Sequence, residues 1–241
     1  MNILLLVAHP DDETIMCGAT IDKLVHNQHK VYVSFYTKNE QAYFGKEKQQ
    51  SRVKRTVKEA ELSSKLLGFK YNFLGFKDMD LAKDKGLLIR ATIKEIRRVK
   101  PDIIITHNLN DKHIDHKTLA EIVPEANFQS GCCLCGGHEI WKAEIVLKGE
   151  VNLEMTSSFS FDFISSVSAK NITKKIKAFN GYESVKNEHQ TTQAWLLEKI
   201  KITAKLRGAT IGNEYGEAFC LNNYSPISGT STKLLSQFLE Q

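Results

Sequence analysis

The sequence has few cysteines, few prolines and no long apolar run. Its 241 residues include five Cys and four Pro, and three of the cysteines are crowded together at Cys132, Cys133 and Cys135. An odd, crowded set of cysteines is poor material for a disulfide framework, so we expect a reducing, cytoplasmic compartment. No stretch reaches the roughly 18 apolar residues that a membrane-spanning helix needs, so we expect no membrane span.

Signals for secretion and for nucleic-acid binding are also missing. The chain begins MNILLLVAHP, without a basic residue before the apolar run or a small-residue cleavage site after it, so we expect no signal peptide. The net charge is +5, but the Lys residues are scattered along the chain. Because no basic stripe with interleaved aromatic residues occurs, we expect no nucleic-acid partner and interpret the charge as a solvated surface.

Apolar runs alternate with helical patterns along the first half of the chain. We expect buried strands at 2–8, 30–37, 71–75 and 102–108, and helices at 13–26, 51–67, 86–99 and 116–126. Strand and helix in alternation predict an α/β protein with a mostly parallel sheet. Further along we expect strands at 143–151, 155–164 and 217–222 and helices at 170–181 and 189–206. The length suits one domain over residues 1–241.

Two polar clusters follow two of these strands. AHPDDE (8–13) follows the first strand, and THNLNDKHIDH (106–116) ends and follows the strand that begins at Asp102. Ligands of an open parallel sheet bind outside the carboxyl ends of its strands. We therefore expect the two clusters to lie on the same rim of the sheet, although about a hundred residues separate them.

The clusters hold the residue types of a catalytic zinc site. Such sites use three protein ligands, commonly His and a carboxylate, and leave one position for water. His9 and Asp12 can converge at a strand-to-helix turn, and His116 can supply the third ligand. If Asp12 binds the metal, Asp11 is free to act as a base on the metal-bound water. The alternative for this acidic run is helix capping and dipole chemistry alone, but the presence of both clusters favours the metal site.

The motifs AHPDDE and HIDH (113–116), together with KPDIIITH and LRGATIGNEYGEAF, resemble the LmbE/PIG-L family of zinc-dependent N-deacetylases. The resemblance spans most of the chain. It implies a Rossmann-like fold with helices on both faces of the sheet, one Zn²⁺ per chain, and a small-molecule substrate. The implied reaction removes the N-acetyl group from an amino sugar of the N-acetylglucosamine type or from its conjugate. His and Asp ligands also accept other divalent metals, and the sequence does not encode an oligomeric state.

The resemblance assigns roles to individual residues. It assigns the metal to three ligands: His9, Asp12 and His116. It makes Asp11 the general base, and it makes His113 the group that stabilises the oxyanion or protonates the leaving amine, with Asp115 orienting it. We expect the charge of Asp115 to raise the pKa of His113, so that this residue acts as an imidazolium.

Substrate contacts are predicted less directly. The family often has a substrate-binding Arg in the helix at 51–67, and here the candidates are Arg52 and Arg55. His107 ends a strand on the active rim, so we consider it for a substrate or supporting role. The chain also departs from the family pattern, because Ile114 replaces a frequent Pro and GYESVKNEHQ (181–190) replaces a frequent Ser-Gln pair.

Two other functions remain open. One is a zinc amidase that acts on a larger amide or a thiol conjugate. The other is a non-catalytic nucleotide-binding module, but no G-x-G-x-x-G follows the first strand, and three acids there would repel a pyrophosphate. The cysteine cluster with His138 could hold a second zinc ion, but structural zinc usually uses two separated ligand pairs, so an unusual loop is the simpler interpretation.

Overall fold

The computed structural model describes residues 1–42, 48–134, 139–151, 158–183, 192–222 and 226–240. Their strands form one seven-stranded sheet in the order β3-β2-β1-β4-β5-β7-β6. The strands are β1 (Asn2–Val7), β2 (Lys30–Phe35), β3 (Lys70–Phe73), β4 (Ile103–His107), β5 (Ile145–Gly149), β6 (Phe163–Val167) and β7 (Tyr215–Leu221). The five strands β1 to β5 pair in parallel, and β7 runs antiparallel to both of its neighbours. The predicted mostly parallel α/β sheet is confirmed.

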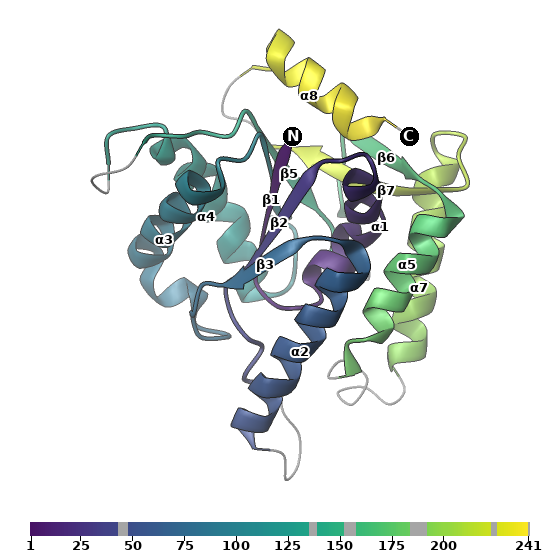
Figure 1. The fold of residues 1–241 in the computed structure, drawn as a ribbon, viewed down its shortest axis with the longest axis horizontal. Coiled ribbons are helices and arrows are strands. Elements are labelled where there is room, and N and C mark those ends of the chain that lie inside the picture. The colour runs from purple at the N-terminus through teal and green to yellow at the C-terminus, as the bar shows by residue number, and fades with distance from the viewer. Residues whose placement is uncertain (43–47, 135–138, 152–157, 184–191, 223–225, 241) are drawn as a thin grey trace.

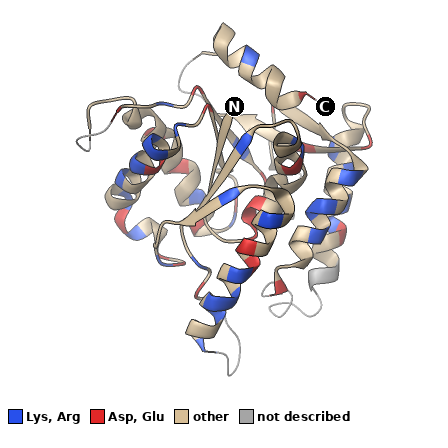
Figure 2. Ribbon diagram, in the orientation of Figure 1, with Lys and Arg blue, Asp and Glu red and all other residues tan. Residues whose placement is uncertain are grey.

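Helices cover both faces of the sheet, as predicted (Figure 1). The helices are α1 (Asp12–His26), α2 (Gln49–Leu67), a 3₁₀ turn η1 (Leu81–Asp84), α3 (Lys85–Val99), α4 (Ile114–Ser130), α5 (Ala169–Asn180), α7 (Thr192–Ala209) and α8 (Gly229–Leu239). In Figure 1, α3 and α4 lie on one side of the sheet, and α1, α2, α5 and α7 lie on the other. Lys and Arg are spread over α2, α3, α5 and α7 instead of collecting on one helix (Figure 2).

β1 is apolar from Ile3 to Val7 because both of its faces are covered. Ile3, Leu5 and Val7 pack into the cluster under α1, whereas Leu4 and Leu6 pack into the cluster under α3 and α4. All five side chains are completely buried. A continuous apolar run therefore marks the central strand of the sheet.

Some predicted boundaries are confirmed and others are wrong. α2 ends at Gly68 with φ 82°, the left-handed conformation that favours glycine at a helix end. The strand expected at 155–164 is instead β6 at Phe163–Val167, because this segment pairs with β7; residues 152–157 lie outside the described part of the chain. The helix expected at 116–126 begins at Ile114 and continues to Ser130.

One helix escaped the sequence analysis. α8 begins at a capping box formed by Ser228 and Ser231. Its Phe238 is completely buried, with its ring 5.4 Å from that of Phe219 and 6.1 Å from that of Phe163. Contact with β6 and β7 stabilises this helix, which is too short to be stable by itself.

The strand order reverses its direction at the carboxyl end of β1. The chain winds from β1 to β2 and β3 on one side of the sheet, and β4 lies on the other side of β1. Such a switch point is where open α/β sheets bind their ligands. The segments that follow β1 and β4 meet there, as expected from the sequence. In the described part of the chain, no helix has the length and apolar content to cross a membrane.

Candidate metal centre

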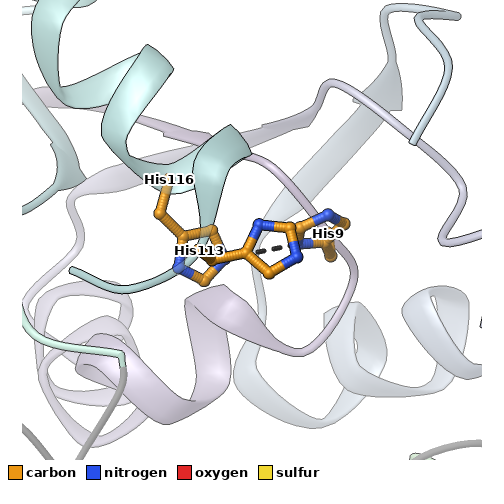
Figure 3. A group of neighbouring side chains, drawn as sticks. All are labelled: His9, His113 and His116. Atoms are coloured by element: carbon orange, nitrogen blue, oxygen red, sulfur yellow. Dashed lines mark hydrogen bonds between the residues drawn. The ribbon is translucent and has the colours of Figure 1, made fainter. Parts of the chain in front are cut away.

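Three side chains from the two rim segments converge at the switch point. Nδ1 of His9 lies 3.3 Å from Nε2 of His116. One oxygen of Asp12 lies 3.4 Å from Nδ1 of His9, and its other oxygen lies 3.3 Å from Nε2 of His116. All three residues are buried. Figure 3 shows His9 meeting His116 and His113, which come from the start of α4.

These distances fit a divalent cation. Donor atoms bound to zinc at about 2.1 Å in a tetrahedral arrangement lie about 3.4 Å from one another. The two imidazole nitrogens have this spacing from each other, and each of them has it from a different oxygen of Asp12. Two imidazoles and one carboxylate are a donor set of catalytic zinc. His9, Asp12 and His116 therefore could hold a metal ion together, and their role as its ligands is taken up below as a proposal.

Two carboxylates that the sequence analysis did not select hold the outer nitrogens of the two histidines. Oδ1 of Asp78 lies 3.1 Å from Nε2 of His9, and Oδ2 of Asp111 lies 3.1 Å from Nδ1 of His116. Carboxylates in this position orient metal-binding imidazoles and raise their basicity. Asp111 belongs to the second motif, and Asp78 follows the carboxyl end of β3. A search of every strand end on the rim could have found Asp78.

Asp115 has a different partner from the predicted one. Its carboxylate accepts hydrogen bonds from the backbone N–H groups of Met79 at 2.8 Å and Leu81 at 3.3 Å. It is completely buried, and one of its oxygens lies 3.5 Å from Nε2 of His9. The side chain of Asp115 thus fixes the segment that carries Asp78, and the contact with His113 is made by the Asp115 backbone.

His113 is the N-cap of α4. Its Nδ1 accepts a hydrogen bond from the backbone N–H of Asp115 at 3.2 Å, which leaves Nε2 as the nitrogen that carries the proton. Its ring centroid lies 4.7 Å from that of His9 and 4.7 Å from that of His116. Burial, followed by the charges of His9 and His116, lowers the pKa of His113. The expected increase was wrong, because these effects outweigh the charge of Asp115.

His107 lies behind the cluster. It is completely buried, and its ring stacks on that of His116 at 4.0 Å between centroids. Its Nε2 accepts the N–H of Ala8 at 3.0 Å and lies 3.4 Å from Asp12. Burial and the neighbouring His116 lower the pKa of His107, so its imidazole is neutral. This geometry favours support of the ligands over contact with a substrate.

The charges of Asp12 and His116 stabilise each other. Burial opposes the ionisation of Asp12, but the charge of His116 and hydrogen bonds from His116 and His9 hold the pKa of Asp12 well below its usual range. Burial likewise opposes the protonation of His116. The charge of the Asp12 carboxylate outweighs the effect of burial and raises the pKa of His116 to about 9. Asp12 is therefore a buried anion, and its charge favours a cation beside it.

The remaining candidate residues lie at the edges of the centre or away from it. Asp11 is half-buried and directly precedes α1. Arg52 is buried on α2, and Arg55 on the same helix is half-exposed, 3.9 Å from Glu59. A substrate contact by either Arg stays a prediction.

The cysteine loop is held in place by α3. The guanidinium of Arg97 donates to the carbonyl oxygens of Ser130, Cys132 and Leu134 at 3.1, 2.6 and 2.7 Å. Cys132 and Cys133 are free thiols. Cys135 and His138 lie outside the described residues, so a zinc site in this loop stays untested.

The fold and the site define an α/β protein with a doubly wound sheet and a candidate metal centre at its switch point. The chain belongs to the PIG-L family: the family model, described as GlcNAc-PI de-N-acetylase, matches residues 4–127. This range begins within β1 and contains β2 to β4 and each residue of the candidate centre. The predicted family is therefore confirmed.

Solved structures share the fold over nearly the whole chain. The N,N'-diacetylchitobiose deacetylase from Pyrococcus horikoshii has a TM-score of 0.78 at 20% identity, covering 92% of this chain and 83% of its own. The 4-carboxy-2-hydroxymuconate hydratase from Pseudomonas putida KT2440 has a TM-score of 0.80 at 20% identity, covering 95% and 98%. The A40926 pseudoaglycone deacetylase has a TM-score of 0.71 at 16% identity, covering 93% and 98%. Since two deacetylases and a hydratase share this fold, the fold alone does not decide the reaction.

Proposed function

We propose that the protein is a metal-dependent N-deacetylase that acts on an N-acetylated amino sugar or its conjugate. The observation that carries the proposal is the distance of 3.3 Å between Nδ1 of His9 and Nε2 of His116, each of which has one oxygen of Asp12 at 3.3–3.4 Å. Asp11 directly precedes Asp12 in the chain. The family description and the names of two of the similar structures support the same reaction. One zinc ion per chain suits the donor set, and other divalent ions also suit it.

The residues around the centre divide the reaction among them. A bound divalent cation would supply Lewis-acid polarisation of the acetamide carbonyl. Asp11 accepts a proton from the attacking water and passes it to the leaving amine, so that acetate and a free amine are formed. His113, neutral with its proton on Nε2, donates a hydrogen bond to the developing oxyanion. This assignment uses His113 as a donor without requiring an imidazolium.

The surrounding carboxylates keep these groups in place. Asp78 and Asp111 orient the imidazoles of His9 and His116. Asp111 also accepts the backbone N–H of His113 at 2.8 Å, so one carboxylate connects two residues of the centre. Loss of either carboxylate would weaken metal binding, because the imidazole that it orients would lose its fixed position.

The alternative hydrolase, an amidase, would use the same site and differ only in its substrate. The same groups would hydrolyse a larger amide or a thiol conjugate. A nucleotide-binding module is disfavoured, since Asp11, Asp12 and Glu13 occupy the place where such a module binds pyrophosphate. We further propose that residues 1–241 form one domain and that Arg52 and Arg55 are the residues to test first for substrate recognition. The buried position of His107 behind His116 favours a supporting role for this residue. The cytoplasmic location stays a prediction from the cysteine content.

The proposal is tested with purified, zinc-loaded protein. Acetate release is followed by proton NMR on a panel of N-acetylated amino sugars, their glycosides, and larger amides. We expect turnover with at least one acetamido sugar, and we expect Asp11→Asn to be on the order of a hundred- to ten-thousandfold slower with its metal retained. Asp102→Asn is the matched control, because Asp102 bonds the backbone of Asn2 at the opposite end of the sheet. No acetate from any acetamido sugar would overturn the proposal, and turnover of only the larger amides would favour the amidase.

A further inference from the structure

The backbone of Asp11 is in an unusual conformation. Its φ is 115° and its ψ is −30°. The other non-glycine residues with positive φ in the described part of the chain have φ between 51° and 65°, which is the ordinary left-handed region. A value of 115° is a conformation that favours glycine. Such strain persists only where the surroundings fix it, and it is concentrated at functional sites.

Both backbone groups of Asp11 are fixed by hydrogen bonds. Its carbonyl oxygen accepts the N–H groups of Thr14 at 3.0 Å and Ile15 at 2.9 Å, which begins α1. Its own N–H donates to Oε2 of Glu13 at 3.0 Å. The carbonyl contacts belong to any helix start, whereas the contact with Glu13 is a side-chain contact specific to this turn.

Glu13 is itself fixed by residues from three parts of the chain. Its side chain is completely buried, so it cannot touch a substrate. Its Oε1 accepts the hydroxyl groups of Thr14 at 2.6 Å, Ser63 of α2 at 2.8 Å and Tyr182 at 2.7 Å. Tyr182 follows α5 and is also buried. One oxygen of Glu13 thus gathers three hydroxyl groups, and the other oxygen contacts the backbone of Asp11.

We propose that Glu13, anchored by Ser63 and Tyr182, is the positioning residue that holds Asp11 in its strained conformation and so aims its carboxylate at the metal centre. The effect on turnover rests on the function proposed above, whereas the effect on the backbone does not. The proposal also gives a role to the segment that begins at Gly181, where the chain lacks the Ser-Gln pair frequent in the family. Tyr182 from this segment reaches into the interior instead of toward the candidate centre.

The first experiment compares two buried tyrosines. Tyr182→Phe removes only the hydroxyl group that Glu13 accepts. Tyr36→Phe is the matched control, since Tyr36 is also completely buried and its hydroxyl group bonds Thr92 of α3 at 2.6 Å. We expect kcat to fall about tenfold in Tyr182→Phe with KM and bound metal unchanged, and to stay at the wild-type value in Tyr36→Phe. An equal effect of the two substitutions on kcat would mean a general loss of stability and would overturn the proposal.

A second measurement reads the backbone directly. Glu13→Gln preserves the shape of the side chain but replaces one acceptor oxygen by an amide nitrogen, which cannot accept both sets of donors. We expect the crystal structure of this variant to show φ of Asp11 moved from 115° toward negative values while His9 and Asp12 stay in place. An unchanged φ in Glu13→Gln would overturn the proposal.

A third measurement uses stability and needs no activity. Asp11→Gly and Asp11→Ala both remove the carboxylate, but only glycine adopts φ 115° without strain. The unfolding midpoint of the Gly variant should therefore exceed that of the Ala variant in the wild-type background, and this difference should shrink in the Glu13→Gln background. The same difference in both backgrounds would contradict the role of Glu13. A wild-type protein without deacetylase activity would overturn the proposed function and leave this result standing.

Discussion

Nδ1 of His9 and Nε2 of His116 lie 3.3 Å apart although 107 positions separate the two residues in the sequence. Two imidazole nitrogens at this distance repel each other through their lone pairs unless a proton or a cation lies between them. One oxygen of Asp12 faces each nitrogen. The negative charge of this carboxylate would therefore compensate the positive charge of a proton or a metal ion between the two imidazoles. The geometry of the predicted ligands is therefore arranged around a positive charge.

We predict that His116→Ala loses the metal. Removal of one of three ligands leaves two donors and an uncompensated Asp12 carboxylate, so binding should weaken by far more than a hundredfold. Elemental analysis after dialysis measures the stoichiometry, with one equivalent expected in the wild type and less than a tenth in the variant. His26→Ala is the control, since His26 is an exposed residue at the end of α1. A full equivalent of metal in His116→Ala would show that the ligand set is wrong.

We predict that Asp78→Ala and Asp111→Ala each lower the affinity for the metal without abolishing metal binding. Each substitution removes the carboxylate that orients one imidazole, an effect of roughly 10- to 100-fold in affinity. Competition with a chromogenic chelator measures the affinity. Asp84→Ala is a suitable control, because Asp84 caps α3 by accepting the N–H of Leu87. Affinities equal to that of the control would remove both residues from the centre.

We predict that His113→Ala retains its metal and lowers kcat on the order of a hundredfold. Burial lowers the pKa of His113 from its ordinary value, which favours the neutral imidazole at pH 7, and the residue stays neutral as the pH rises. The loss of activity at high pH therefore belongs to another group, and the basic limb of the pH–rate profile should be the same in the variant and the wild type. A basic limb that disappears in His113→Ala would assign that limb to His113 after all.

We predict that Lys23 makes the stability depend on pH. Burial lowers the pKa of Lys23 from 10.5 to about 8, and its ammonium group donates to Ser165 at 2.8 Å. Between pH 8 and 10.5 the folded protein binds fewer protons at this site than the unfolded chain, so stability should rise with pH over this window. At pH 7 the buried charge costs at most about 3 kcal/mol. Urea unfolding of Lys23→Met should show higher stability at pH 7 and a smaller gain toward pH 10; parallel curves for variant and wild type would refute this.

We predict that Gly208→Ala is strongly destabilising. A Cβ at this position would lie 2.5 Å from the backbone N and Cα of Tyr215, where α7 packs on β7. Because backbone atoms cannot move aside as a flexible side chain can, we expect a loss of about 2 kcal/mol or more. Gly229→Ala is the control, since nothing lies within 4 Å of its added Cβ, and its effect should stay within about 0.5 kcal/mol. Urea unfolding measures the stability of both variants, and similar unfolding midpoints for the two would contradict the prediction.

The close approach at Gly208 also explains part of the motif LRGATIGNEYGEAF. A Cβ at Gly216 would lie 2.4 Å from Ile164 and 3.2 Å from the backbone of Gly208. The two glycines let a helix and a strand pack at backbone distance. The sequence identified this motif only by its resemblance to a family, and the packing supplies its physical reason.

The sequence by itself determined the parallel part of the sheet and the two motifs that meet at its rim, but not α8 or the bounds of β6. The apolar run of β1 and the alternation of strand and helix indicated a parallel sheet, because a strand covered on both faces must be apolar throughout. Parallel strands place their carboxyl ends on one rim, so the predicted meeting of His9 with His116 followed from strand order alone. These inferences rest on local patterns and on one rule of topology, both of which can be read along the chain.

Only the tertiary structure decided which side chains hold these residues in place. Asp78 reaches His9 from 69 positions away, Tyr182 reaches Glu13 from 169 positions away, and the carboxylate of Asp115 bonds Met79 instead of orienting His113. The pKa of His113 fell where the local sequence predicted a rise, since burial and the charges of the distant His9 and the nearby His116 outweigh the charge of Asp115. Contacts between segments, desolvation and backbone strain depend on the packed arrangement of the whole chain, and no local pattern encodes them.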